Sequence, residues 1–111
     1  MDCIFCRIIA KEIPAEIVFE DNNVCCFKDI HPAAEFHVLL VTKKHVPSVK
    51  TCSPEDLPLI YELINRARLL AEAHNLDGYK LHFNVGAAGG QIVPHVHLHL
   101  LGGKELNHNL G

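Results

Sequence analysis

The pattern of hydrophobic and polar residues predicts three strands in the first 42 residues. Residues 16–20 and 24–28 carry strand-forming side chains, and the Asp21-Asn22-Asn23 between them suits a tight hairpin turn. Residues 36–42 are too continuously apolar for an exposed strand, so we expect them at the centre of a sheet. Ahead of the hairpin, residues 2–13 predict a short helix that ends before Pro14.

A long helix is predicted from Ser53 to about His74. Ser53 as the cap, Pro54 at the first position and acidic residues after it are typical of a helix start. Asn75 and Gly78 lie where a helix ends. The helical repeat gives an unusually wide apolar stripe, made of Leu57, Ile60, Tyr61, Leu63, Ile64, Ala67, Leu70 and Ala71.

Two further strands are predicted on either side of a glycine-rich loop. Residues 79–85 alternate in polarity, residues 86–91 form the loop, and the last strand runs from His95 to Leu101. The order of elements favours an α+β fold, a five-stranded antiparallel sheet with one long helix and a short N-terminal helix. At 111 residues we expect a single domain over residues 1–111.

The last predicted strand carries histidine at every second position. His95, His97 and His99 would share one face of the strand, while the aliphatic residues between them share the other. Histidine is a mediocre strand former whose charge changes near neutral pH, so this row indicates a metal site or a proton-handling catalytic site. Positions i to i+4 of a strand span ~13 Å, which disfavours a single catalytic metal held by all three rings.

Charge and cysteine content narrow the class of protein. The net charge of −3 gives no general field for DNA, RNA or an anionic membrane, so we expect none of these as partners. No basic leader or membrane-length apolar run occurs, and the five cysteines are odd in number. We therefore expect a soluble cytoplasmic protein, which could also enter the nucleus, with reduced thiols or a metal site.

Several motifs, in the expected order, resemble the histidine triad (HIT) superfamily. They are residues 3–9 (CIFCRII), 12–14 (EIP), 27–32 (FKDIHP), 43–45 (KKH), 89–91 (GGQ) and the H-x-H-x-H of residues 95–99. The resemblance covers essentially the whole chain. The compact length and the Leu101-Gly102-Gly103 after the triad look like the Hint branch of purine nucleoside phosphoramidases. The resemblance also implies a symmetric homodimer with a ten-stranded sheet.

The resemblance implies a hydrolase that cleaves purine nucleoside 5′-phosphoramidates of the AMP or GMP type, without a catalytic metal. His97 would attack phosphorus and form a nucleotidyl-histidine that water cleaves, while the main-chain carbonyl of His95 holds its other nitrogen. His99 would bind phosphate oxygen and help to protonate the leaving amine. The residues implied in substrate binding are Asp29, Ile30, Phe27, Ile4, Phe5, Ile8, Ile13, Asn84, Gly90, Gln91, Ile92 and Val93.

A second implied feature is a structural zinc site. Cys3 and Cys6 alone are half of such a site, and in HIT proteins with this pair it is completed by histidines that match His45 and His95. Cys25 and Cys26 are adjacent in a strand and are expected in the core on opposite faces. Surface or internally satisfied histidines are expected at His31, His37, His74, His82 and His108.

The chain departs from the Hint-like pattern at Ile92, where serine is usual, at Pro94, and in residues 107–111, which lack a tryptophan. Two alternatives therefore stay open: a dinucleoside polyphosphate hydrolase of a related HIT branch, and a non-catalytic nucleotide-binding or interaction protein. Length and Gly102-Gly103 favour the phosphoramidase over the first, and the intact His97 argues against the second.

Overall fold

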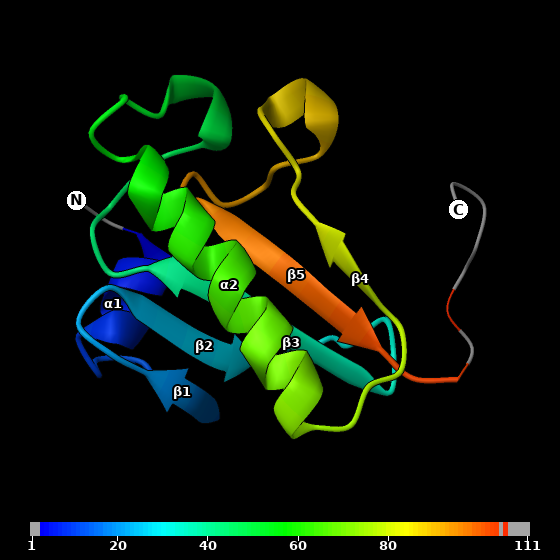
Figure 1. Cartoon of the computed structure of the whole chain (residues 1–111). Coiled ribbons are helices and arrows are strands. Elements are labelled where there is room, and N and C mark those ends of the chain that lie inside the picture. Colours follow the sequence, from blue (N-terminus) through cyan, green and yellow to red (C-terminus); the bar gives the residue numbers. More distant parts are fainter. Residues whose placement is uncertain (1–2, 105, 107–111) are drawn as a thin grey trace.

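The computed structural model describes residues 3–104 and 106 and contains one five-stranded antiparallel sheet (Figure 1). Across the sheet the strands are β1 (Ile17–Glu20), β2 (Val24–Lys28), β3 (Phe36–Thr42), β5 (His97–Gly102) and β4 (Tyr79–His82). The apolar strand β3 is central, as its composition predicts. The predicted α+β fold is confirmed.

Each face of the sheet carries its own hydrophobic core. The long helix α2 (Leu57–Ala73) covers one face, and the short helix α1 (Ile4–Ile9) packs on the other. Strand residues alternate between the two, so Cys26 lies in the α2 core and Cys25 in the α1 core, both fully buried as expected. Neither helix, nor any other in the described residues, combines the length and hydrophobicity needed to cross a membrane.

Strand register decides which face carries the histidines. In the β3–β5 ladder Val41 lies opposite His97 and Leu39 opposite His99. Leu39 and Val41 belong to the α1 core, and residues directly opposite each other point to the same face of the sheet. His97 and His99 therefore face the side of the sheet that α1 covers, away from the long helix.

The long helix begins later than predicted. It starts at Leu57, and residues 53–56 form a turn in which the N–H of Asp56 donates to the carbonyl of Ser53 (3.0 Å). Pro58 explains the difference, because a helix begun at Pro54 would press the Pro58 ring against the Pro54 carbonyl. The helix end agrees with the prediction: Ala73 is the last residue, and Asn75 adopts φ of 57°.

Both strands beside the glycine loop are shorter than predicted. Strand β4 ends at His82, and Asn84 lies in the loop, where its Nδ2 donates to the carbonyl of Gly89 (2.8 Å). Strand β5 begins at His97 rather than His95. Pro94 has no N–H, and the N–H of His95 turns back to the carbonyl of Val93 (2.8 Å), so the chain joins the ladder only after these residues.

Candidate active site

His97 is a buried imidazole with its tautomer fixed by the backbone. It is 8% exposed at the start of β5, and its Nδ1 lies 2.8 Å from the carbonyl oxygen of His95. A carbonyl can only accept, so Nδ1 carries the proton and the lone pair is on Nε2. The ring of Phe5 packs edge-on against His97 with centroids 5.1 Å apart, which fixes the imidazole plane. His97 therefore presents a nucleophilic nitrogen in one orientation.

A second chain of hydrogen bonds fixes the tautomer of His99. The N–H of Ala33 donates to Nδ1 of His37 (3.0 Å), so neutral His37 carries its proton on Nε2. That Nε2 lies 2.9 Å from Nδ1 of His99, which must accept. The proton of neutral His99 is consequently on Nε2. The ring centroids of His97 and His99 lie 5.2 Å apart, so a ring with an acceptor nitrogen stands next to a ring with a donor nitrogen.

Burial keeps His99 and His37 uncharged near neutral pH. The pKa of His99 is lowered to about 4, chiefly by desolvation and in smaller part by nearby His97, His37 and His82, while Asp29 opposes the shift. Desolvation also lowers the pKa of His37, again against the opposing charge of Asp29. Each ring thus holds one proton, as the hydrogen-bond chain requires.

His37 is the site residue that sequence reasoning missed. It was expected to be an ordinary surface or satisfied histidine, but it is buried and contacts His99. Its Nε2 also lies 3.5 Å from Oδ2 of Asp29. The available signal was its place in an otherwise apolar central strand, two residues from Leu39 on the face that carries the triad. His82, which was also expected to be a surface or internally satisfied histidine, packs edge-on against His99 with ring centroids 5.8 Å apart.

Donor atoms of Asp29, His37 and His99 lie within 4.8 Å of one another, close enough to raise the question of a metal ion. The N–H of Ala33 argues against it, because it occupies Nδ1 of His37 and so keeps a proton on the nitrogen that would have to bind the ion. The arrangement suits proton handling better than metal binding.

The glycine loop is rigidly braced beside the triad. The side chain of Gln91 accepts from the N–H of Gly86 (2.9 Å) and donates to the carbonyls of Pro47 (2.7 Å) and Val93 (3.0 Å). Gly90 has φ of 87°, and a side chain there would approach Nδ2 of Asn84 to 3.2 Å. Gln91 thus shapes the loop through its side chain, leaving backbone amides as the groups for an anion.

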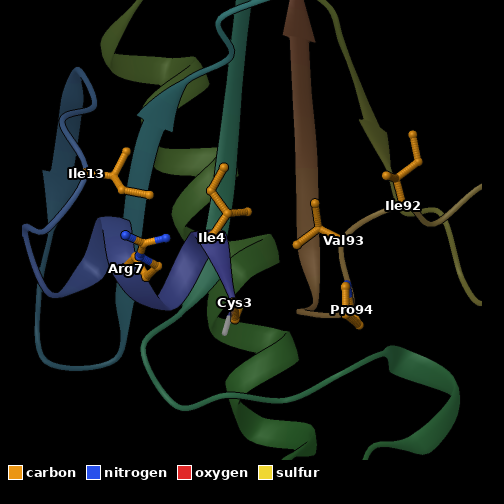
Figure 2. A pocket seen from close by; sticks show the side chains of 7 residues that line it. All are labelled: Cys3, Ile4, Arg7, Ile13, Ile92, Val93 and Pro94. Atoms are coloured by element: carbon orange, nitrogen blue, oxygen red, sulfur yellow. The ribbon is translucent and has the colours of Figure 1, made fainter. Parts of the chain in front are cut away.

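A pocket of about 330 Å³ opens between α1 and the segment that leads into the triad (Figure 2). This volume lies at the lower end of the range for small-molecule sites. Four of its lining residues, Ile4, Ile13, Ile92 and Val93, are among those implied in substrate binding, and Cys3, Arg7 and Pro94 complete the lining.

The remaining implied substrate residues fall into three environments. Phe5, Ile8 and Phe27 are buried in the α1 core and lie beneath the surface rather than in the pocket wall. Ile30 is 84% exposed. Asp29 is half-buried, and its Oδ1 accepts a hydrogen bond from the N–H of His31 (2.8 Å).

The four residues of the implied metal site come together on the α1 side. Donor atoms of Cys3, Cys6, His45 and His95 all lie within 4.8 Å of one another. The ring of His95 is fully buried and donates from Nε2 to the carbonyl of Thr42 (2.7 Å), so its Nδ1 lone pair faces the cluster. Burial lowers the pKa of His95 to about 4, which keeps that lone pair available.

The spacing of these donors fits a tetrahedral ion. With Zn–N of about 2.05 Å and Zn–S of about 2.3 Å, two nitrogens would be about 3.3 Å apart and a nitrogen–sulfur pair about 3.6 Å. Nδ1 of His45 lies 3.2 Å from Nδ1 of His95, and the Sγ atoms of Cys3 and Cys6 lie 3.4 and 3.6 Å from the same His95 nitrogen. The residues present therefore suit a Cys₂His₂ metal site.

Comparisons with known proteins agree over the whole chain. A family model described as "Scavenger mRNA decapping enzyme C-term binding" matches residues 2–109. Protein HitA of Neisseria gonorrhoeae is 47% identical, over 91% of this chain and 95% of that protein. A HIT family hydrolase from Legionella pneumophila has a crystal structure that matches with a TM-score of 0.93 and 45% identity, over 99% of this chain and all of that one.

A second solved structure is equally similar in shape. A histidine triad protein from Clostridium difficile matches with a TM-score of 0.93 and 37% identity, over 97% of this chain and 96% of that chain. An uncharacterized HIT-like protein of Synechocystis is 45% identical over 96% of this chain and 94% of its own length.

The free energy of unfolding should decrease as the pH is lowered, because the fold holds His99 neutral. The folded pKa is about 4 against 6.5 for the unfolded group, so between those values the unfolded chain binds a proton that the folded chain does not. Stability is full above pH 6.5 and is lost as the pH falls toward 4, by an amount on the order of 3 kcal/mol from His99 at 1.36 kcal/mol per pKa unit. Urea unfolding at several pH values should show a flatter curve for His99→Gln. The exposed His31→Gln is the control, and equal slopes in all three proteins would contradict the assignment.

Proposed function

We propose that this chain, which belongs to the histidine triad superfamily, is a hydrolase that cleaves purine nucleoside 5′-phosphoramidates to a nucleoside monophosphate and an amine. The observation that carries the proposal is the pairing of a nucleophilic nitrogen on His97 with a donor nitrogen on His99, each fixed by its own hydrogen-bond partner. Solved relatives named as hydrolases support the reaction class.

In the first step Nε2 of His97 attacks phosphorus, and the bond from phosphorus to the amine nitrogen breaks. The His95 carbonyl accepts from Nδ1–H and stabilises the positive charge that develops on the ring. The amine leaves with a proton from Nε2 of His99, because an unprotonated amine is a very poor leaving group. The donor is the imidazolium form of His99, which the bound phosphate anion favours, so the ring is left neutral when the amine departs. Water then cleaves the Nε2–phosphorus bond and returns a proton to His99.

The protonation of His99 depends on the substrate. A bound phosphate anion opposes the desolvation that lowers the pKa of His99, because an opposite charge favours the imidazolium. His37 and Asp29 act as positioning residues, since they set which His99 nitrogen faces the substrate.

The nucleotide would use both ends of the site. Ile4 and Ile13 offer apolar surface to the base, and the loop amides near Gly90 together with Asn84 lie where phosphate contacts are expected. Asp29 could accept hydrogen bonds from ribose hydroxyls, as a carboxylate does well.

The Cys3–Cys6–His45–His95 cluster is proposed to hold a structural zinc ion, which would tie α1 to the sheet. No step of the reaction uses it. Its influence on catalysis is indirect, through His95, whose ring lies in the cluster and whose carbonyl orients His97.

We further propose a homodimer. The outer surface of α2 exposes Leu57, Tyr61 and Ile64, by 53%, 67% and 41%, and the edge strand β4 exposes Leu81 by 42%. An apolar helix face beside an unpaired strand edge suits pairing with a second copy through a continuous sheet.

Replacing the proposed nucleophile should abolish turnover. His97→Ala should lower the hydrolysis rate of an adenosine 5′-phosphoramidate by roughly 10⁴-fold or more. Mass spectrometry of wild type quenched and kept at alkaline pH, where the phosphorus–nitrogen bond to histidine is stable, should detect a nucleotidyl adduct that His97→Ala lacks. His31→Ala, an exposed histidine outside the site, should behave as wild type. An active His97→Ala protein would rule out the covalent mechanism.

Zinc analysis should find about one ion per chain. Cys6→Ser should lose most of it and should melt about 5–10 °C lower, because it loses metal and the anchoring of α1. Cys52→Ser is the matched control, since Cys52 lies outside the cluster. Equal metal content in the two variants would refute the assignment.

Sedimentation velocity should give the mass of a dimer for the wild type and of a monomer for Tyr61→Asp, because dimerisation would bury the new charge without a partner. Asn22→Asp adds the same charge in the β1–β2 turn and should remain dimeric. A monomeric wild type would exclude this proposal.

A further inference from the structure

The side chain of Ile92 is the most exposed large hydrophobic group among the described residues, at 91%, and it lines the pocket beside the triad. Single exposed apolar residues are common on protein surfaces. Ile92 differs because its position in the pocket places it where a bound molecule would cover it.

The exposure of Ile92 is fixed by its neighbours. The Gln91 side chain is tied at three points, to Gly86, Pro47 and Val93. Pro94 restricts the backbone on the other side, and the His95 N–H bonds to Val93. The segment therefore holds Ile92 out at the pocket rim as part of an ordered loop.

Ile92 and the α1 residues stand at different ends of the pocket. Figure 2 shows Ile13 and Arg7 on one side of the view and Ile92 on the other, with Val93 and Pro94 between them. A base bound against Ile4 and Ile13 leaves the Ile92 end to another part of the substrate. Arg7, the charged member of the lining, belongs to the α1 end.

We propose that Ile92 selects substrates whose leaving group is an apolar amine, such as an arylalkyl amine. This rests on the proposed function. Attack in line places the departing nitrogen on the side of phosphorus opposite Nε2 of His97, and we assign it to the Ile92 end of the pocket because the base takes the α1 end. As the His97–phosphorus bond forms, the phosphorus–nitrogen bond breaks and the amine departs with a proton from His99.

The chemistry of the side chain sets the preference. Contact with the Ile92 side chain stabilises a bound apolar leaving group, because both remove apolar surface from water. The same side chain offers no hydrogen bond to a polar leaving group. Contacts of this size in a hydrophobic pocket discriminate between substrates by about 10- to 200-fold.

The test compares two adenosine 5′-phosphoramidates, one of 2-phenylethylamine and one of ethanolamine, whose amines are similar in basicity. The wild type should favour the phenylethyl substrate by about 10-fold or more in kcat/KM. Ile92→Ser should bring the ratio close to one, and Ile92→Leu should keep it. Val85→Ser, at an apolar residue 37% exposed outside the pocket lining, should leave the ratio unchanged.

A wild-type ratio near one, or a ratio that Ile92→Ser leaves intact, would overturn the inference. The dissociation constants of both compounds for His97→Ala, with and without Ile92→Ser, provide a readout without turnover. If the wild type hydrolyses neither compound, the proposed function fails. In that case the selection of a leaving group fails with it, and only a binding contact between Ile92 and the apolar amine is supported, provided that His97→Ala binds the phenylethyl compound about 10-fold more tightly and Ile92→Ser removes the difference.

Discussion

The position of His95 is the constraint on which the rest of the site depends. Its Nε2–H is held by the Thr42 carbonyl, its Nδ1 faces two thiols and the His45 ring, and its own carbonyl holds Nδ1–H of His97. These contacts use both ring nitrogens and the main chain of a fully buried residue. A change at the cluster is therefore transmitted to the reactive nitrogen through one residue, without any intermediate contact.

The same principle, in which a backbone group decides where a proton resides, operates on the other side of the triad. The Ala33 N–H determines the tautomer of His37, and His37 determines that of His99. Two loops thus assign opposite roles to histidines that are chemically identical and two residues apart. Burial completes the arrangement by keeping His37 and His99 neutral, so that one nitrogen of each of these two rings donates and the other accepts.

Much of this could be predicted from periodicity and motif. The central position of residues 36–42 followed from their uninterrupted apolar character, and the four metal-site residues followed from the family resemblance. The predicted helix start was wrong, because the capping signals at Ser53 and Pro54 compete with Pro58, whose ring would clash with the Pro54 carbonyl in a helix begun there. His37 was missed because its role arises from a partner 62 positions away, which local spacing does not reveal. The strand extension to His95 failed because Pro94 has no N–H and the N–H of His95 bonds to the carbonyl of Val93, so neither residue joins the ladder.

The Cys3–His95 contact joins residues 92 positions apart in the sequence. Contacts this distant form late, because a long loop must close before they stabilise the chain. During synthesis the thiols of Cys3 and Cys6 therefore lack their His95 partner until the segment that leads into strand β5 has left the ribosome. Throughout that interval the two cysteines stay open to oxidation, so the nascent chain is more vulnerable than the finished fold.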